Sequence, residues 1–233
     1  AVVCVATIKA LKYHGGASKE EILNENIEAL ENGIHNLERH IDNLKNVFGL
    51  NVIVAINKYK NDSQKEIDFL REKLLEKNIE LSLVESWEKG GEGAIDLAEK
   101  IVKIAEIDSN FKYTYELNSE IKEKINAVAT KIYGATETVY SELAESKIKE
   151  IEELGYRNLP VCIAKTQYSF SDDAKNLECK EPFKINVQDV LLKAGAEFIV
   201  VLTGKVMTMP GLPKQPAAEQ IDVDENGNIV GIF

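Results

Sequence analysis

The chain has 233 residues, of which 44% are hydrophobic and 29% are charged, a composition typical of a globular protein with one large or two modest domains. Its 28 basic and 39 acidic residues give a formal net charge of −11, which disfavours binding to nucleic acids and anionic membranes. No apolar run approaches the roughly 20 residues that span a bilayer, and no secretion signal is recognisable. We therefore expect a soluble, cytoplasmic protein.

The first half of the chain begins with AVVCVAT (1–7), a continuous apolar, β-branched run that predicts a strand buried on both faces of a sheet. Because a chain seldom begins with such a strand, we expect the sequence to be the C-terminal piece of a longer protein. Ser18 and Glu21 have the spacing of a capping box and predict the start of a long helix that ends at Gly49.

That helix carries one apolar stripe, in which residues recur in steps of three and four. The stripe consists of Ile27, Leu30, Ile34, Leu37, Ile41 and Leu44. We expect it to pack on the sheet. A subunit interface is the alternative, since the same spacing is that of a short heptad seam.

Two further strand–helix units follow. The run NVIVAIN (51–57) predicts a second buried strand, after which Ser63 caps a helix reaching about residue 78. The run IELSLVES (79–86) predicts a third strand, followed by a glycine-containing loop and the helix AIDLAEKIVKIAE (94–106). This alternation implies a parallel sheet with right-handed crossovers, in which ligands bind beyond the carboxyl ends of the strands.

A polar and aromatic connection at 107–120 divides the pattern, so we predict two domains, 1–110 and 111–233. The second domain is expected to start with two amphipathic helices that end near Gly134 and Gly155. The second of these helices is predicted to include Val139.

The rest of the second domain is predicted to be mainly strands. LPVCIAK (159–165) and AEFIVVLTG (196–204) read as strands, and a short helix is expected around 186–194 between them. The proline-rich segment 202–218 predicts a fixed, irregular loop. The dipeptide Asn226–Gly227 predicts the turn of a C-terminal β-hairpin.

Several polar and sulfur-containing residues carry no strong signal. Cys4 and Cys162 lie in apolar strand-like runs and are expected to be small buried residues. The three histidines lack the spacing of a zinc site, and we predict no structural metal. Asp172 and Asp173 are expected in a solvated turn, with a general acid and base pair as the alternative.

The loop after the third predicted strand holds the only tryptophan, Trp87, next to the glycines of KGGEGA (89–94). These glycines match neither GxxxxGK[ST] nor GxGxxG, so we do not expect them to bind a phosphate. Tyr59 lies in the equivalent loop of the preceding strand. The two rings are therefore candidates to clamp a planar heterocycle, and the alternative is that Trp87 only caps the core.

Six stretches spread over nearly the whole chain resemble formate–tetrahydrofolate ligase. They are VATIKALKYHGG (5–16), NLERHIDNLKNVFGLNVIVAINKYKND (36–62), ESWEKGGEG (85–93), KIYGA (131–135), LPVCIAKTQYSFSDD (159–173) and VLTGKVMTMPGLPKQPAAEQIDVDENGNIVGIF (201–233). The family's enzyme uses ATP, with Mg, to activate formate as formyl phosphate and forms 10-formyltetrahydrofolate. The resemblance implies a P-loop-related, Rossmann-like α/β fold and a homotetramer, with small molecules as partners.

The resemblance also implies roles for individual residues. Trp87 matches the tryptophan that stacks on the pterin ring, and Tyr59 matches an aromatic partner that is usually phenylalanine. Leu83 matches an apolar residue that lines the pocket. Two departures stand out, because Lys9 replaces an arginine and Tyr59 adds a hydroxyl group.

The family's P-loop has no counterpart in these 233 residues, and no catalytic residue is assigned within the chain. We therefore expect ligase activity of a full-length enzyme and none of the isolated chain. One alternative is a non-catalytic folate-binding or scaffolding protein of the same fold. Another is a remotely related synthetase with a different acceptor.

Overall fold

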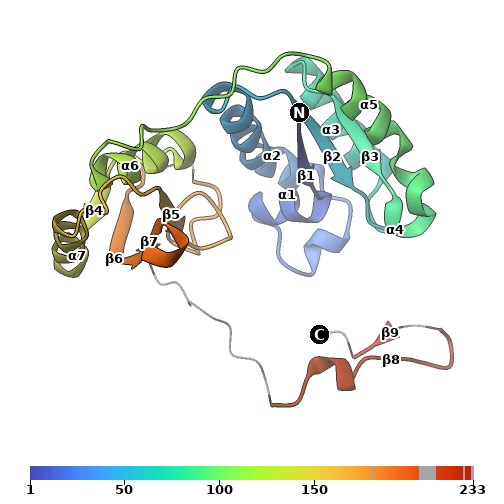
Figure 1. Cartoon of the computed structure of the whole chain (residues 1–233). Helices are drawn as coiled ribbons and strands as arrows, with labels where there is room; N and C mark the ends of the chain where they lie inside the picture. The colour runs from blue at the N-terminus through green and yellow to red at the C-terminus, as the bar shows by residue number, and fades with distance from the viewer. Residues whose placement is uncertain (180, 205–213, 228, 232–233) are drawn as a thin grey trace.

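The structure is a computed structural model of the whole chain, and it describes residues 1–179, 181–204, 214–227 and 229–231 (Figure 1). The described residues form a mixed α/β fold, which confirms the predicted class. Two sheets, one parallel and one mixed, are joined by the long connection that follows residue 105 (Figure 1).

The first sheet consists of β1 (Val2–Ala6), β2 (Val52–Asn57) and β3 (Leu81–Val84), all parallel and adjacent in that order. Five of the six residues of β2 are buried, as its continuous apolar sequence predicted. The prediction that β1 is buried on both faces is wrong, because Val5 is 65% exposed. Among the described strands β1 pairs with β2 alone, so it forms an edge of this sheet.

The helices of the first half connect and cover these strands. They are α1 (Ile8–His14), η1 (Glu21–Leu23), α2 (Ile27–Asp42), the π-helical η2 (Asn43–Val47), α3 (Gln64–Glu76), α4 (Ser86–Lys89), η3 (Gly90–Ala94) and α5 (Ile95–Ala105). Four residues of the predicted stripe, Leu30, Ile34, Leu37 and Ile41, lie in one buried cluster with residues of α3 and of the sheet. The stripe therefore packs in the core of this half, as expected.

One capping box, Ser18 with Glu21, and one further helix cap, Ser63, were predicted from the sequence, and both form, with different outcomes. Ser63 and Glu66 exchange hydrogen bonds of 3.2 and 3.1 Å and begin α3 as predicted. Ser18 and Glu21 also exchange hydrogen bonds, but they begin only the short 3-10 helix η1. The expected long helix starts later, at Ile27, with Asn26 as its cap.

A buried ion pair explains why the chain turns before α2. Lys12 Nζ lies 2.8 Å from Glu66 Oε1, and neither side chain is accessible to more than 1%. Lys12 also donates to the carbonyl oxygen of Asn24 at 2.8 Å, and the N–H of Asn26 donates to Glu66 Oε1 at 3.0 Å. These bonds hold the backbone between η1 and α2 in a non-helical course.

The second half contains α6 (Ile121–Ala127), the π-helical η4 (Val128–Tyr133), α7 (Glu142–Glu153) and the short η5 (Ala194–Ala196). Its sheet consists of β4 (Thr138–Tyr140), β5 (Val161–Ala164), β6 (Ile185–Lys193) and β7 (Phe198–Thr203), in the order β4-β6-β7-β5. The pair β6–β7 is antiparallel, and the pairs β4–β6 and β5–β7 are parallel. Side chains of α6, α7, β6 and β7 form a separate core.

The prediction of a helix around 186–194 is wrong, because this segment is β6. Ile185 and Val187 are buried on one face, and an irregularity between Val187 and Asp189 shifts the alternation so that Val190 is buried as well. Because of this shift, the sequence of β6 does not show the regular alternation of apolar and polar residues that indicates a strand. Likewise, Val139 belongs to β4 instead of the following helix.

The C-terminal hairpin is confirmed by the antiparallel pair β8 (Asp222–Val223) and β9 (Ile229–Val230), which follow the short η6 (Ala217–Glu219). Most of the predicted loop 202–218 lies outside the described residues. The division into domains at about residue 110 stays a prediction. Among the described helices, none combines the length and apolar character needed to cross a membrane.

Candidate functional site

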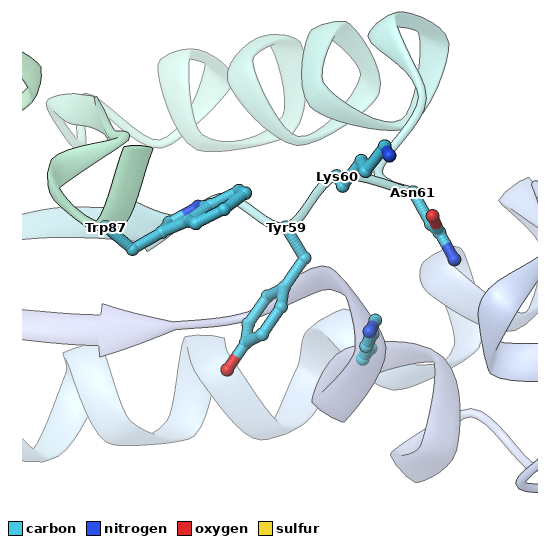
Figure 2. A pocket seen from close by; sticks show the side chains of 5 residues that line it. Tyr59, Lys60, Asn61 and Trp87 are labelled. Atoms are coloured by element: carbon cyan, nitrogen blue, oxygen red, sulfur yellow. The ribbon is translucent and has the colours of Figure 1, made fainter. Parts of the chain in front are cut away.

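A pocket of about 340 Å³ lies where the three parallel strands end, and it is lined by Lys9, Tyr59, Lys60, Asn61 and Trp87 (Figure 2). Lys9 belongs to α1, which follows β1, and Trp87 belongs to α4, which follows β3. The other three residues lie in the loop after β2. The carboxyl ends of parallel strands meet at one edge of a sheet, which is why residues so far apart in sequence share one pocket. We call it the strand-end pocket.

Trp87 lies at the surface of this pocket. Its side chain is 61% exposed, so it does not cap the core. The indole Nε1–H donates to the carbonyl oxygen of Lys58 at 2.8 Å, and the N–H of Lys58 donates to the carbonyl oxygen of Val84 at 3.0 Å. The backbone of Lys58 thus fixes the indole relative to the ends of both β2 and β3.

Tyr59 is held by a turn that closes in both directions. The N–H of Tyr59 donates to Asp62 Oδ2 at 2.8 Å, and the N–H of Asp62 donates to the carbonyl oxygen of Tyr59 at 3.0 Å. The ring itself is free of the core, since Tyr59 is 42% exposed, and Lys9 Nζ lies 4.5 Å from its centroid. Figure 2 shows the phenol ring inclined to the indole ring of Trp87.

The charges around the strand-end pocket are unevenly paired. Glu85 Oε1 lies 2.6 Å from Lys58 Nζ, and its Oε2 lies 2.6 Å from Lys89 Nζ. These two hydrogen-bonded ammonium groups lower the pKa of Glu85 to about 2. Among the ion pairs of the described residues, none involves Lys9 or Lys60, so the ammonium groups of both pocket lysines lack a direct carboxylate contact.

The glycines after Trp87 serve a geometric purpose. A Cβ atom on Gly93 would lie 2.5 Å from the carbonyl carbon of Glu85, and the N–H of Glu85 donates to the carbonyl oxygen of Gly93 at 3.0 Å. Gly90 has φ +60° and ψ −140°, a conformation that favours glycine. The loop therefore turns back against the end of β3. The regular helix α5 begins at Ile95, close to its predicted start at residue 94.

Leu83 lies on β3 and packs, partly buried, against the core of the first half. It does not line the strand-end pocket, and its predicted role in ligand binding stays a prediction. Lys60 and Asn61 do line the pocket, and the sequence patterns did not single them out. Their position in the loop after the second strand, where ligands of parallel sheets bind, is the sequence feature that could have identified them.

Other candidates from the sequence are explained without a ligand. Asp172 Oδ2 accepts hydrogen bonds from the backbone and side chain of Asn186 at 2.7 and 3.1 Å, so it holds a turn against β6. Cys162 is exposed, and the expectation that it is buried is wrong, because its strand alternates instead of being covered on both faces. Among the described residues, no group of three or more His, Cys, Asp or Glu side chains could hold a metal ion.

The family described as formate–tetrahydrofolate ligase matches the sequence over residues 1–233. The chain belongs to this family. Formate–tetrahydrofolate ligases are enzymes that join formate to tetrahydrofolate, and this membership supplies a reaction class that the pocket alone does not define.

Proposed function

We propose that the strand-end pocket binds the pterin ring of tetrahydrofolate, with Trp87 and Tyr59 as its aromatic contacts. The observation that carries this proposal is that two exposed aromatic side chains, from the loops after consecutive parallel strands, line one pocket in a formate–tetrahydrofolate ligase. Leu83, close to the end of β3, is proposed to contribute to the apolar wall near the reacting groups when the substrate is bound.

Physical chemistry favours this pairing of pocket and ligand. An aromatic pair in contact contributes about 0.5–1.5 kcal/mol beyond the area that it buries. Tetrahydrofolate also carries carboxylate groups, and the ammonium groups of Lys9 and Lys60 have no carboxylate partner among the described residues. The pocket thus offers flat apolar surfaces for the ring and positive charge for an anionic ligand.

For the complete reaction, we propose that the enzyme uses ATP and Mg to convert formate to formyl phosphate and then formylates tetrahydrofolate. The sequence contains no GxxxxGK[ST] motif, whose lysine and hydroxyl group contact phosphate and metal. We therefore propose that the 233-residue chain by itself does not carry out the reaction. The two domains (1–110 and 111–233), the homotetramer and the cytoplasmic location remain parts of this proposal.

Trp87 provides a direct test, because it is the only tryptophan of the chain. Titrating the chain with tetrahydrofolate should quench the fluorescence of Trp87 in a saturable way. Tyr59→Ala should raise the Kd about ten-fold, which corresponds to about 1.4 kcal/mol. By calorimetry, Trp87→Ala should raise it by at least as much.

Tyr113→Ala is the matched control, since Tyr113 is 82% exposed and does not line the pocket. Its Kd should equal that of the unchanged chain. If tetrahydrofolate neither quenches Trp87 nor binds in the calorimeter, the folate proposal fails and a synthetase with another acceptor becomes the better interpretation.

The missing phosphate-binding motif also supports the second candidate, a non-catalytic folate-binding or scaffolding protein. A complete reaction mixture with the 233-residue chain alone tests the inactivity that both candidates predict for it. Formation of ADP coupled to 10-formyltetrahydrofolate by the 233-residue chain alone would contradict its proposed inactivity. Saturable folate binding without that product is the result expected for either candidate.

A further inference from the structure

The turn that carries Tyr59 depends on a single acidic side chain, Asp62. Its Oδ2 accepts the N–H of Tyr59 at 2.8 Å, and its own N–H donates to the carbonyl oxygen of Tyr59 at 3.0 Å. Trp87 is attached to the residue before Tyr59, because its indole donates to the carbonyl oxygen of Lys58. The position of the Tyr59 ring therefore depends on Asp62, whereas that of the Trp87 ring depends on the carbonyl group of Lys58.

Asp62 is a buried acidic side chain with one unsatisfied carboxylate oxygen, an arrangement that costs free energy. It is 8% exposed, and its Oδ1 is buried and has no hydrogen-bond partner among the described residues. Burial raises the pKa of its carboxyl group, and the nearby carboxylate of Glu66 acts in the same direction. The hydrogen bond from the N–H of Tyr59 opposes this increase in pKa, as do the charges of Lys12 and Lys9. Costs of this kind are concentrated at functional sites.

The residue after Asp62 has a separate task. Ser63 accepts the N–H of Glu66 and caps α3, while the Tyr59–Asp62 turn involves neither Ser63 nor Glu66. Two adjacent side chains at the end of this loop therefore accept backbone hydrogen bonds: Asp62 stabilises the turn, and Ser63 caps the helix. This separation allows the two tasks to be changed one at a time.

We propose that Asp62 is a positioning residue for the binding of tetrahydrofolate: its carboxylate fixes the backbone of Tyr59 and thereby orients the Tyr59 ring in the strand-end pocket. This inference rests on the proposed function of the pocket. Asp62 itself does not line the pocket and needs no contact with the ligand.

The variants Asp62→Ala, Asp62→Asn and Ser63→Ala test the proposal in the 233-residue chain, with tetrahydrofolate as the ligand and Trp87 fluorescence as the signal. Asp62→Ala should raise the Kd about ten-fold, since a hydrogen bond to a charged acceptor is lost. Asp62→Asn keeps an acceptor oxygen in the same place and should bring the Kd back to within about three-fold of the unchanged chain. Ser63→Ala should lower the unfolding temperature but leave the Kd unchanged.

A double-mutant cycle separates positioning from general loosening of the loop. If Asp62 acts through Tyr59, then Asp62→Ala should have no further effect on the Kd in a Tyr59→Ala background. Equal ten-fold effects in both backgrounds would overturn the proposal. So would an unchanged Kd of Asp62→Ala in a chain whose Kd does respond to Tyr59→Ala. If Tyr59→Ala and Trp87→Ala are both without effect, the proposed function fails instead.

Discussion

The two halves of the molecule stabilise buried lysines in different ways. In the first half, Lys12 pairs with the buried carboxylate of Glu66 at 2.8 Å. In the second half, Lys124 is fully buried but donates only to the carbonyl oxygens of Arg157 and Leu159, at 2.5 and 2.9 Å. The positive charge of Lys12 is paired with a buried carboxylate, whereas that of Lys124 contacts carbonyl dipoles and interacts with Glu152 only at longer range.

Lys165, after β5, repeats the second arrangement. Its ammonium group donates to the carbonyl oxygens of Thr166 and Ser171 at 2.8 and 3.2 Å and also to that of Ser169. Burial lowers the pKa of both Lys124 and Lys165. A lysine that follows a strand can therefore bind the carbonyl groups of its own loop, as Lys165 does. It can also line a pocket, as Lys9 does in the first half.

The largest expected effect comes from breaking the ion pair of the first half. Lys12→Met leaves the buried carboxylate of Glu66 without its cation, and it should lower the free energy of unfolding by about 3–5 kcal/mol. Urea denaturation at pH 7 measures this change. The exposed pair Lys65–Glu25 is the control, and Lys65→Met should cost less than about 1 kcal/mol.

The double variant Lys12→Met, Glu66→Gln sharpens the interpretation, because it removes both charges. It should be more stable than Lys12→Met alone. A double variant as unstable as the single one would show that the uncompensated charge is not the cause of the loss.

A smaller effect is expected for Lys124→Met in the second half. Two carbonyl oxygens lose their donor but no buried charge is left, so the free energy of unfolding should fall by about 1–3 kcal/mol. A loss as large as that of Lys12→Met would remove the contrast between the two halves.

The same variant has a consequence for pH dependence. The pKa of Lys124 is lowered in the folded protein from its ordinary value of 10.5, so unfolding takes up a proton between these two values. This group therefore makes stability rise with pH in that window. Measured against the unchanged chain, Lys124→Met should lack that part of the rise when urea denaturation is repeated at a series of pH values up to 10.5.

The smallest effect is expected for the two ion pairs that Glu85 forms with Lys58 and Lys89 beside the strand-end pocket. The folded pKa of Glu85 is about 2, below the ordinary value of 4.5, so its contribution to stability is present above pH 4.5 and is lost as the pH falls through about 2. The unfolding temperatures of Glu85→Gln and of the unchanged chain should therefore differ by a constant amount from about pH 8 to pH 5 and converge toward pH 2. A difference in unfolding temperature that is already lost at pH 5 would show that these ion pairs do not stabilise the folded chain.

Much of the first half could be predicted from local patterns. The apolar run of β2 is almost entirely buried, and Ser63 caps the start of α3 as expected. The errors arise where distant contacts override a local signal. The Ser18 box is genuine, but Lys12 and Glu66 redirect the chain behind it, and the irregularity in β6 conceals its strand period.

The candidate site shows the same limit. Trp87 and Tyr59 could be selected from the sequence, because each follows a predicted buried strand and belongs to a residue type that binds planar rings. Asp62 could not be selected, since an aspartate before a helix cap is common in loops. Only its burial and its bonds to Tyr59 distinguish it.

Gly93 shows how far from a ligand a sensitive position can lie. Its α-carbon fits against the backbone of Glu85 only because it has no side chain, and Gly93 does not line the strand-end pocket. Any larger residue would push Glu85 outward, and with it the residues that Glu85 joins, Lys58 and Lys89. In a genetic screen, a Gly93 substitution would therefore look like damage to the binding site itself, although it removes no group that a ligand could touch.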